Sequence, residues 1–79
     1  MFYVYILRSL KDGKRYIGMT ANLIRRLKEH HAGLVTSTRN RRPLLLIHTE
    51  LFPSKELAAQ REHFYKTGKG REVLKSLGL

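Results

Sequence analysis

Two short segments rich in β-branched and aromatic residues, separated by a turn, constrain the fold of this chain most strongly. The first covers residues 2–7 and is too short for a stable helix, so its composition predicts a strand. Asp12 and Gly13 form a dipeptide that is typical of hairpin turns, and a second strand is predicted over residues 15–18. The chain is therefore expected to begin with a β-hairpin.

A helix is predicted over residues 22–31, after Thr20 as a candidate N-cap and before Gly33, which suits the position just beyond a helix end. Four residues define its predicted apolar stripe: Leu23, Ile24, Leu27 and His31. The following residues, 34–42, show no hydrophobic periodicity and are predicted to form an exposed loop.

The second half of the chain predicts one more strand and two helices. Residues 44–50 begin with four apolar residues in a row, which favours a strand at the centre of the sheet. Ser54 is a candidate cap for a helix over residues 55–66, and a short helix is expected after Gly68 and Gly70. We therefore predict an α+β fold, a small three-stranded antiparallel sheet flanked by helices in the order ββαβαα, and one domain over residues 1–79.

The charge of the chain indicates the class of partner. Sixteen Lys and Arg against six Asp and Glu give a net charge of +10, which attracts polyanions and makes nucleic acid the expected partner. A role in solubility alone is the alternative. The absence of cysteine excludes disulfides and thiolate chemistry, and apolar runs of about five residues fall short of the roughly 20 in a membrane span. We expect a cytoplasmic protein without membrane contact.

Tyr5 and Tyr16 are the first candidates for chemistry. Each stands in one strand of the hairpin, and adjacent antiparallel strands can bring both phenols to one face of the sheet. The structural alternative is that both rings fill the sheet surface with their hydroxyls at the rim. Gly18, which follows the second strand aromatic closely, can likewise mark a bend or bulge.

The first helix adds Arg26 and His30, which are four positions apart and share one helical face. Arginine offers a planar fork for phosphate oxygens, and histidine can transfer a proton near pH 7. Arg26 alone is equally compatible with a solvated helix face. His31 is predicted to pack at the edge of the core.

Glu62 on the second long helix borders its apolar stripe, where a carboxylate requires a partner. Mg²⁺ suits such a position, because it often takes one or two protein carboxylates and completes its shell with water and phosphate oxygens. A salt bridge to an arginine of the first helix is the alternative. The four histidines have no spacing that matches a compact zinc site.

These residues resemble the motifs of the GIY-YIG endonucleases. Tyr3, Val4 and Tyr5 are similar to the first motif, and Tyr16, Ile17 and Gly18 match the second. Further elements follow in register: Arg26 eight residues after Gly18, then His30, and Glu62 as the late helical acid. Tyr3 departs from the glycine in the family name. The chain is most similar to small stand-alone members of the branch that includes structure-specific endonuclease subunits.

The resemblance implies hydrolysis of DNA phosphodiester bonds, in a setting such as DNA repair or recombination. It implies one Mg²⁺ or Mn²⁺ ion held by Glu62, charge stabilisation by Arg26, and Tyr5 or Tyr16 as the base. His30 would transfer the proton or contact phosphate. No small-molecule cofactor is expected, and DNA shape or a partner protein is expected to supply specificity.

The exposed loop is expected to contact the DNA backbone, because phosphate contacts require charge and hydroxyl groups but no code for bases. Its candidate residues are Thr38, Arg39, Arg41 and Arg42. A nucleic-acid-binding module that has the same fold but does not cut DNA is the alternative function.

Overall fold

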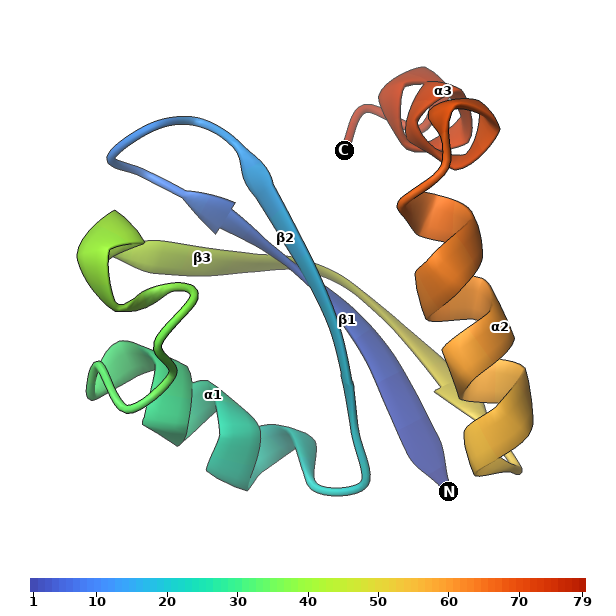
Figure 1. Cartoon of the computed structure of the whole chain (residues 1–79), viewed down its shortest axis with the longest axis horizontal. Helices are drawn as coiled ribbons and strands as arrows, with labels where there is room; N and C mark the ends of the chain where they lie inside the picture. Colours follow the sequence, from blue (N-terminus) through green and yellow to red (C-terminus); the bar gives the residue numbers. More distant parts are fainter.

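The fold is a three-stranded antiparallel sheet with helices on both faces (Figure 1). The computed structural model describes residues 1–79. In chain order its elements are β1 (Phe2–Ser9), β2 (Arg15–Thr20), α1 (Leu23–His31), a short 3-10 helix η1 (Arg39–Arg41), β3 (Leu44–Phe52), α2 (Lys55–Tyr65) and α3 (Gly68–Ser76). The predicted α+β class and ββαβαα order are confirmed. None of the helices has the length and apolarity needed to cross a membrane.

The central strand of the sheet is β1, because the strand order is β2-β1-β3. Its residues from Val4 to Leu7 are at most 1% exposed, so both faces of this strand are covered. The prediction that the third strand is central was wrong. β3 is an edge strand that leaves Leu45 and Leu51 about half exposed, at 51% and 49%. A run of apolar residues was present in both strands and did not distinguish the centre from the edge.

The two faces of the sheet carry separate apolar clusters. On one face, Val4, Ile6 and Ile17 pack against α2 and α3 through Ala58, Tyr65 and Leu74. On the other face, Tyr5, Leu7 and Leu44 pack against Leu23 and Leu27 of α1. Figure 1 shows the sheet lying between α1 and α2. The Tyr5 side chain therefore lies on the face that α1 covers, whereas Glu62 belongs to α2 on the opposite face.

Helix α1 is rotated relative to the predicted apolar stripe. Its N-cap is Asn22, whose side chain accepts a hydrogen bond from the Arg25 amide, and the predicted Thr20 cap was wrong. Ile24 is 70% exposed and His31 is exposed, whereas His30 is completely buried. A polar side chain was thus buried in place of an apolar one.

Helices α2 and α3 are joined by a tight bend. Ser54 caps α2 as predicted, and the Thr67 side chain caps α3. Gly70 is buried in α3, where an added Cβ would collide with the backbone of Phe64 and Tyr65. The close approach of the two helices therefore depends on this glycine, and it fixes the end of α2 that carries Glu62.

Candidate active site

The Tyr5 ring lies across Gly18 on the face of the sheet that α1 covers. Tyr5 in β1 is directly opposite Gly18 in β2, and a Cβ added to Gly18 would come within 2.5 Å of the Tyr5 Cζ and Oη atoms. Any side chain at position 18 would displace the phenol. Gly18 therefore provides the space that the Tyr5 side chain occupies.

Tyr5, His30 and Thr38 form a buried hydrogen-bonded chain. The Tyr5 hydroxyl lies 2.7 Å from His30 Nε2, and His30 Nδ1 lies 2.8 Å from Thr38 Oγ1. Both His30 and Thr38 are completely buried. Burial, aided by the positive charges of Arg26 and His31, lowers the pKa of His30 to about 4. The His30 imidazole is therefore neutral at pH 7, with both ring nitrogens in hydrogen bonds.

Tyr16 completes an aromatic cluster with Tyr5 and His30. The Tyr16 ring centroid lies 6.4 Å from that of Tyr5 and 5.1 Å from that of His30. The prediction that the two tyrosines share one face of the sheet is therefore confirmed. Tyr16 is only partly buried, so its side chain lies between this buried cluster and solvent.

Arg26 lies at the outer side of the cluster. Its guanidinium donates a hydrogen bond to Glu29 at 3.2 Å, and about a third of each side chain is exposed. Burial raises the pKa of the Tyr5 phenol, although the nearby Arg26 guanidinium opposes that shift. The Tyr5 hydroxyl in turn raises the pKa of Arg26. One permanent cation therefore faces the phenol.

Glu62 stands on α2 with its carboxylate about a quarter exposed, and Lys66 Nζ donates to it at 3.0 Å. The predicted alternative, a salt bridge to an arginine of the first helix, was wrong, because Arg26 pairs with Glu29 instead. The negative charge of Glu62 contributes to the raised pKa of Tyr5, although burial is the largest cause. Glu62 therefore acts electrostatically on the same site.

The donor set around Glu62 fits one kind of metal ion. No group of three or more His, Asp or Glu side chains gathers in the structure, so Glu62 offers a single, partly exposed carboxylate. Mg²⁺ and Mn²⁺ accept such a site, because water and substrate phosphate oxygens can complete the shell of a hard cation. The residues present therefore fit a one-carboxylate site for a hard divalent ion.

The predicted DNA-contacting loop divides into two pairs of residues. Thr38 is buried against His30, and the Arg41 guanidinium donates to Asp12 at 3.0 Å and to the Arg15 carbonyl at 3.2 Å. Thr38 does not fit a contact with DNA, because it is completely buried, and Arg41 fits one poorly, because it is partly buried and forms an ion pair with Asp12. The local sequence did not indicate that Thr38 binds His30 or that Arg41 binds Asp12.

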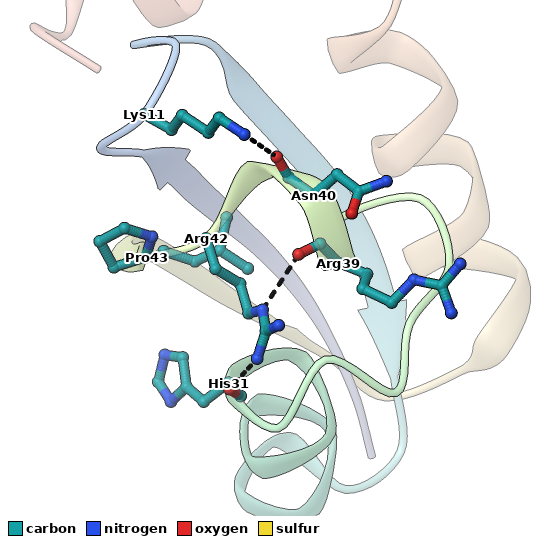
Figure 2. Close-up of a pocket in the computed structure, with 7 residues that line it drawn as sticks. Lys11, His31, Arg39, Asn40, Arg42 and Pro43 are labelled. Carbon is teal, nitrogen blue, oxygen red and sulfur yellow. Dashed lines mark hydrogen bonds between the residues drawn. The ribbon is translucent and has the colours of Figure 1, made fainter.

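Arg39 and Arg42 line an open hollow of about 540 Å³ at the end of α1 (Figure 2). Lys11 and His31 also line it, and no acidic residue does. The Arg42 guanidinium donates to the backbone oxygens of Arg39 and His31, at 3.0 and 3.2 Å. We call these residues the basic hollow. Its charge and exposure fit an anionic ligand.

Glu50 lies at the centre of a partly buried polar network that the sequence interpretation did not predict. Its carboxylate accepts hydrogen bonds from Tyr65, from His48 Nε2 at 2.7 Å and from Arg61 Nε at 3.0 Å. Burial raises the pKa of Glu50, but these hydrogen bonds outweigh it and leave the pKa below its ordinary value. The Arg61 guanidinium also lies 4.5 Å from the centre of the Tyr65 ring. This network joins β3 to α2, next to Glu62.

Comparison with known proteins agrees with this geometry. The family model described as the GIY-YIG catalytic domain matches residues 1–75. A UPF0213 protein of Natronomonas pharaonis is 50% identical over 66 residues, which cover 82% of this chain and 76% of the relative. A UPF0213 protein of Staphylococcus haemolyticus is 40% identical over 76 residues, covering 95% of this chain and 92% of the relative.

A solved structure of another UPF0213 protein is also similar to this chain. The solution NMR structure of a UPF0213 protein from Bacillus halodurans aligns with a TM-score of 0.59 and 43% identity. The alignment covers 98% of this chain and 85% of that protein. With the matched family model and these relatives, the chain belongs to the GIY-YIG catalytic domain family.

Proposed function

We propose that this protein is a metal-dependent endonuclease that hydrolyses phosphodiester bonds of DNA. The observation that carries the proposal is the 2.7 Å contact between the Tyr5 hydroxyl and His30 Nε2, beside the Arg26 guanidinium. A non-catalytic DNA-binding module has no need for a buried phenol–imidazole pair next to a cation and a carboxylate. The resemblance to structure-specific endonuclease subunits supports DNA of repair or recombination as the substrate.

The Tyr5–His30 pair acts as the general base in this proposal. His30 is neutral at pH 7, and its tautomer with the proton on Nδ1 donates to Thr38 Oγ1 and leaves Nε2 free to accept. As a water molecule attacks phosphorus, its proton passes to the Tyr5 oxygen, while the Tyr5 proton passes to His30 Nε2. The proton ends on His30, so Tyr5 never has to exist as a free phenolate. This route replaces the ionisation of a phenol whose pKa burial raises with the transient protonation of His30, whose pKa burial lowers to about 4.

Arg26 and Tyr16 bind the reacting phosphate. Arg26 supplies a planar, permanently charged donor beside Tyr5, which suits the negative charge that develops on the phosphate oxygens. Tyr16 is partly exposed and packs against the His30 ring, so its hydroxyl is available to hydrogen-bond phosphate or the attacking water. Both groups are close to Tyr5, whose orientation depends on Gly18.

Glu62 would hold a Mg²⁺ or Mn²⁺ ion, since such an ion can take a single protein carboxylate and complete its shell with water and phosphate oxygens. Bound there, the ion supplies positive charge that stabilises the charged phosphate and the departing oxygen in the transition state. In the structure, Lys66 Nζ donates a hydrogen bond to the Glu62 carboxylate and balances its negative charge. An ion at Glu62 would replace this contact with Lys66.

The basic hollow holds the DNA backbone in this proposal. Arg39 and Arg42, predicted as backbone contacts, share the hollow with Lys11, whose Nζ donates to the Asn40 carbonyl at 3.0 Å (Figure 2). Each side chain keeps further N–H donors for phosphate oxygens. The net charge of +10 supports attraction of the polyanion over a longer range.

A cleavage assay tests the proposed function. Supercoiled plasmid, flap DNA and branched DNA are incubated with the wild-type protein in Mg²⁺, in Mn²⁺ and in EDTA. We expect nicks in the presence of either ion, none in EDTA, and loss of cutting in Glu62→Gln. Glu72→Gln, which changes an exposed acid on α3, serves as the matched control and should cut like the wild type. DNA binding without cutting of any substrate would support the non-catalytic module instead.

A further inference from the structure

A second basic surface, separate from the basic hollow, begins at the candidate active site. Two adjoining hollows lie beside β2, and both are lined by Arg15 and Arg71. One has a volume of about 230 Å³ and also contacts Tyr16 and Lys66. The other, of about 490 Å³, is completed by Arg8, Gly13 and Lys14. Because they share two residues, the hollows form one surface that we call the β2 track.

Most cations of the β2 track have no acidic side chain as a partner, and Lys66, which pairs with Glu62, is the exception. Its lining includes five basic residues, which are Arg8, Lys14, Arg15, Lys66 and Arg71, and no Asp or Glu. The acid in the nearby turn, Asp12, is paired with Arg41. Lys14 and Arg71 are exposed and form no ion pair, so their mutual repulsion is unrelieved within the protein. A bound polyanion would relieve it.

Part of the β2 track is held in place by hydrogen bonds. The Arg8 guanidinium donates to the Gly13 carbonyl at 2.9 Å, and Arg15 Nε donates to the Leu79 backbone oxygen at 2.9 Å. These bonds fix the side chains while leaving other guanidinium N–H groups free. Planar forks in fixed positions suit phosphate groups spaced along a backbone.

The position of the β2 track next to the candidate active site indicates the class of its ligand. Tyr16 lies at one end of it, and Lys66, which also lines that end, is the partner of Glu62. An anion that follows the track from Arg8 towards Lys66 therefore reaches Tyr16 and the ion-pair partner of Glu62. A nucleic acid strand provides phosphates both in the track and at the reacting position, whereas an acidic peptide provides no reacting phosphodiester.

We propose that the β2 track binds the phosphate backbone of substrate DNA on one side of the bond that is cut. This inference rests on the proposed function and goes beyond it, because it assigns a DNA path to residues outside the reacting cluster. The basic hollow at the end of α1 shares no lining residue with the track. The protein thus has two distinct surfaces for DNA phosphates.

The test compares two double variants with equal charge. Lys14→Gln/Arg71→Gln removes two cations from the track, whereas Lys55→Gln/Lys75→Gln removes two exposed cations that line none of the hollows. Binding of a labelled DNA duplex is measured by fluorescence anisotropy at several salt concentrations in EDTA, so that no cutting occurs. Thermal melting checks each variant, and the single variant Lys14→Glu in the turn provides a second probe.

The expected result is a change in the salt dependence of binding. Each lost phosphate contact reduces the slope of log affinity against log salt by about 0.9, so the track variant should lose about two units of slope. The control variant should keep the wild-type slope. Equal slope changes in the two double variants, or no change in the track variant, would overturn the proposal. A larger loss for an RNA duplex of the same sequence would overturn the assignment to DNA.

The outcome also separates this inference from the proposed function. If the wild-type protein cuts no DNA in the plasmid assay but the slopes differ as expected, the track is supported and the nuclease function fails. If the wild-type protein cuts DNA and the slopes are equal, the nuclease function stands and the track proposal fails.

Discussion

The Tyr5 hydroxyl lies 2.7 Å from Nε2 of His30, although 25 residues separate the two in the chain. One residue comes from the central strand and the other from α1, which packs on that face of the sheet. The contact joins a phenol whose pKa burial raises to an imidazole whose pKa burial lowers to about 4. Both groups are therefore neutral at pH 7, and a hydrogen bond joins them.

Thr38→Val tests whether the hydrogen bond between Thr38 and His30 stabilises the fold. The substitution keeps the shape of the side chain but removes the oxygen that lies 2.8 Å from His30 Nδ1. Because a buried polar atom then loses its partner, the free energy of unfolding should fall by about 1–3 kcal/mol. Urea denaturation measures the change. Thr36→Val, an exposed threonine of the same loop, should leave stability unchanged, and an equal loss in both variants would contradict the buried role of Thr38.

Gly18→Ala tests the space that Tyr5 occupies. The added Cβ would lie 2.5 Å from the Tyr5 Cζ and Oη atoms, so the ring must move away from His30. Overpacking of this kind costs about 1–3 kcal/mol, and DNA cutting should be lost because the base is displaced. Gly68→Ala is the control, since no atom lies within 4 Å of a Cβ there. A Gly18→Ala protein with wild-type stability and cutting would refute this packing argument.

His30 predicts a pH dependence of stability. Its folded pKa of about 4 lies below the ordinary value of 6.5, so between these values the unfolded chain binds a proton that the folded chain does not. Unfolding free energy should therefore fall as pH drops from 6.5 to 4. His30→Gln should flatten this part of the profile in urea titrations at several pH values. His31→Gln, at an exposed position, should keep the wild-type slope, and parallel profiles for wild type and His30→Gln would contradict the prediction.

Arg26→Gln separates catalysis from stability. Arg26 is about a third exposed and pairs with Glu29 on the same helix, so its removal should cost at most about 1 kcal/mol of stability. Loss of a cation beside the reacting phosphate should slow cutting by about 10²–10³-fold. Single-turnover cleavage and thermal melting measure the two effects. Arg25→Gln changes the exposed neighbour and should cut normally. A large drop in melting temperature without slower cutting would assign Arg26 a structural role.

The hairpin and its tyrosines could be predicted from the sequence because strand geometry is local. Strand alternation and a short turn suffice to bring Tyr5 and Tyr16 to one face, and the structure has both there. The place of β3 in the sheet could not be predicted, because an apolar run indicates burial but not which strand lies beside which. The edge position of Leu45 follows from pairing with β1, which is a long-range property.

The partners of Thr38 and Glu50 could not be predicted for a related reason. The sequence predicts Thr38 as an exposed hydroxyl in a basic loop, but the side chain is hydrogen-bonded to His30. The predicted apolar stripe of that helix includes His31, which is exposed, and not His30, which is buried. Glu50 was overlooked although His48 stands two positions away on the same strand, a spacing that places both side chains on one face. Its other partners, Arg61 and Tyr65, come from α2 and were not apparent from local sequence.

Tyr5→Phe is the most direct test of the central proposal that Tyr5 and His30 form the base of a DNA-cutting site. The variant keeps the ring over Gly18 and removes only the hydroxyl that contacts His30. Single-turnover cleavage at saturating protein is compared with the wild type and with Tyr3→Phe, a control on the same strand. The account predicts a fall of about 10²–10⁴-fold for Tyr5→Phe with unchanged DNA affinity. Cutting by Tyr5→Phe at the wild-type rate would contradict it.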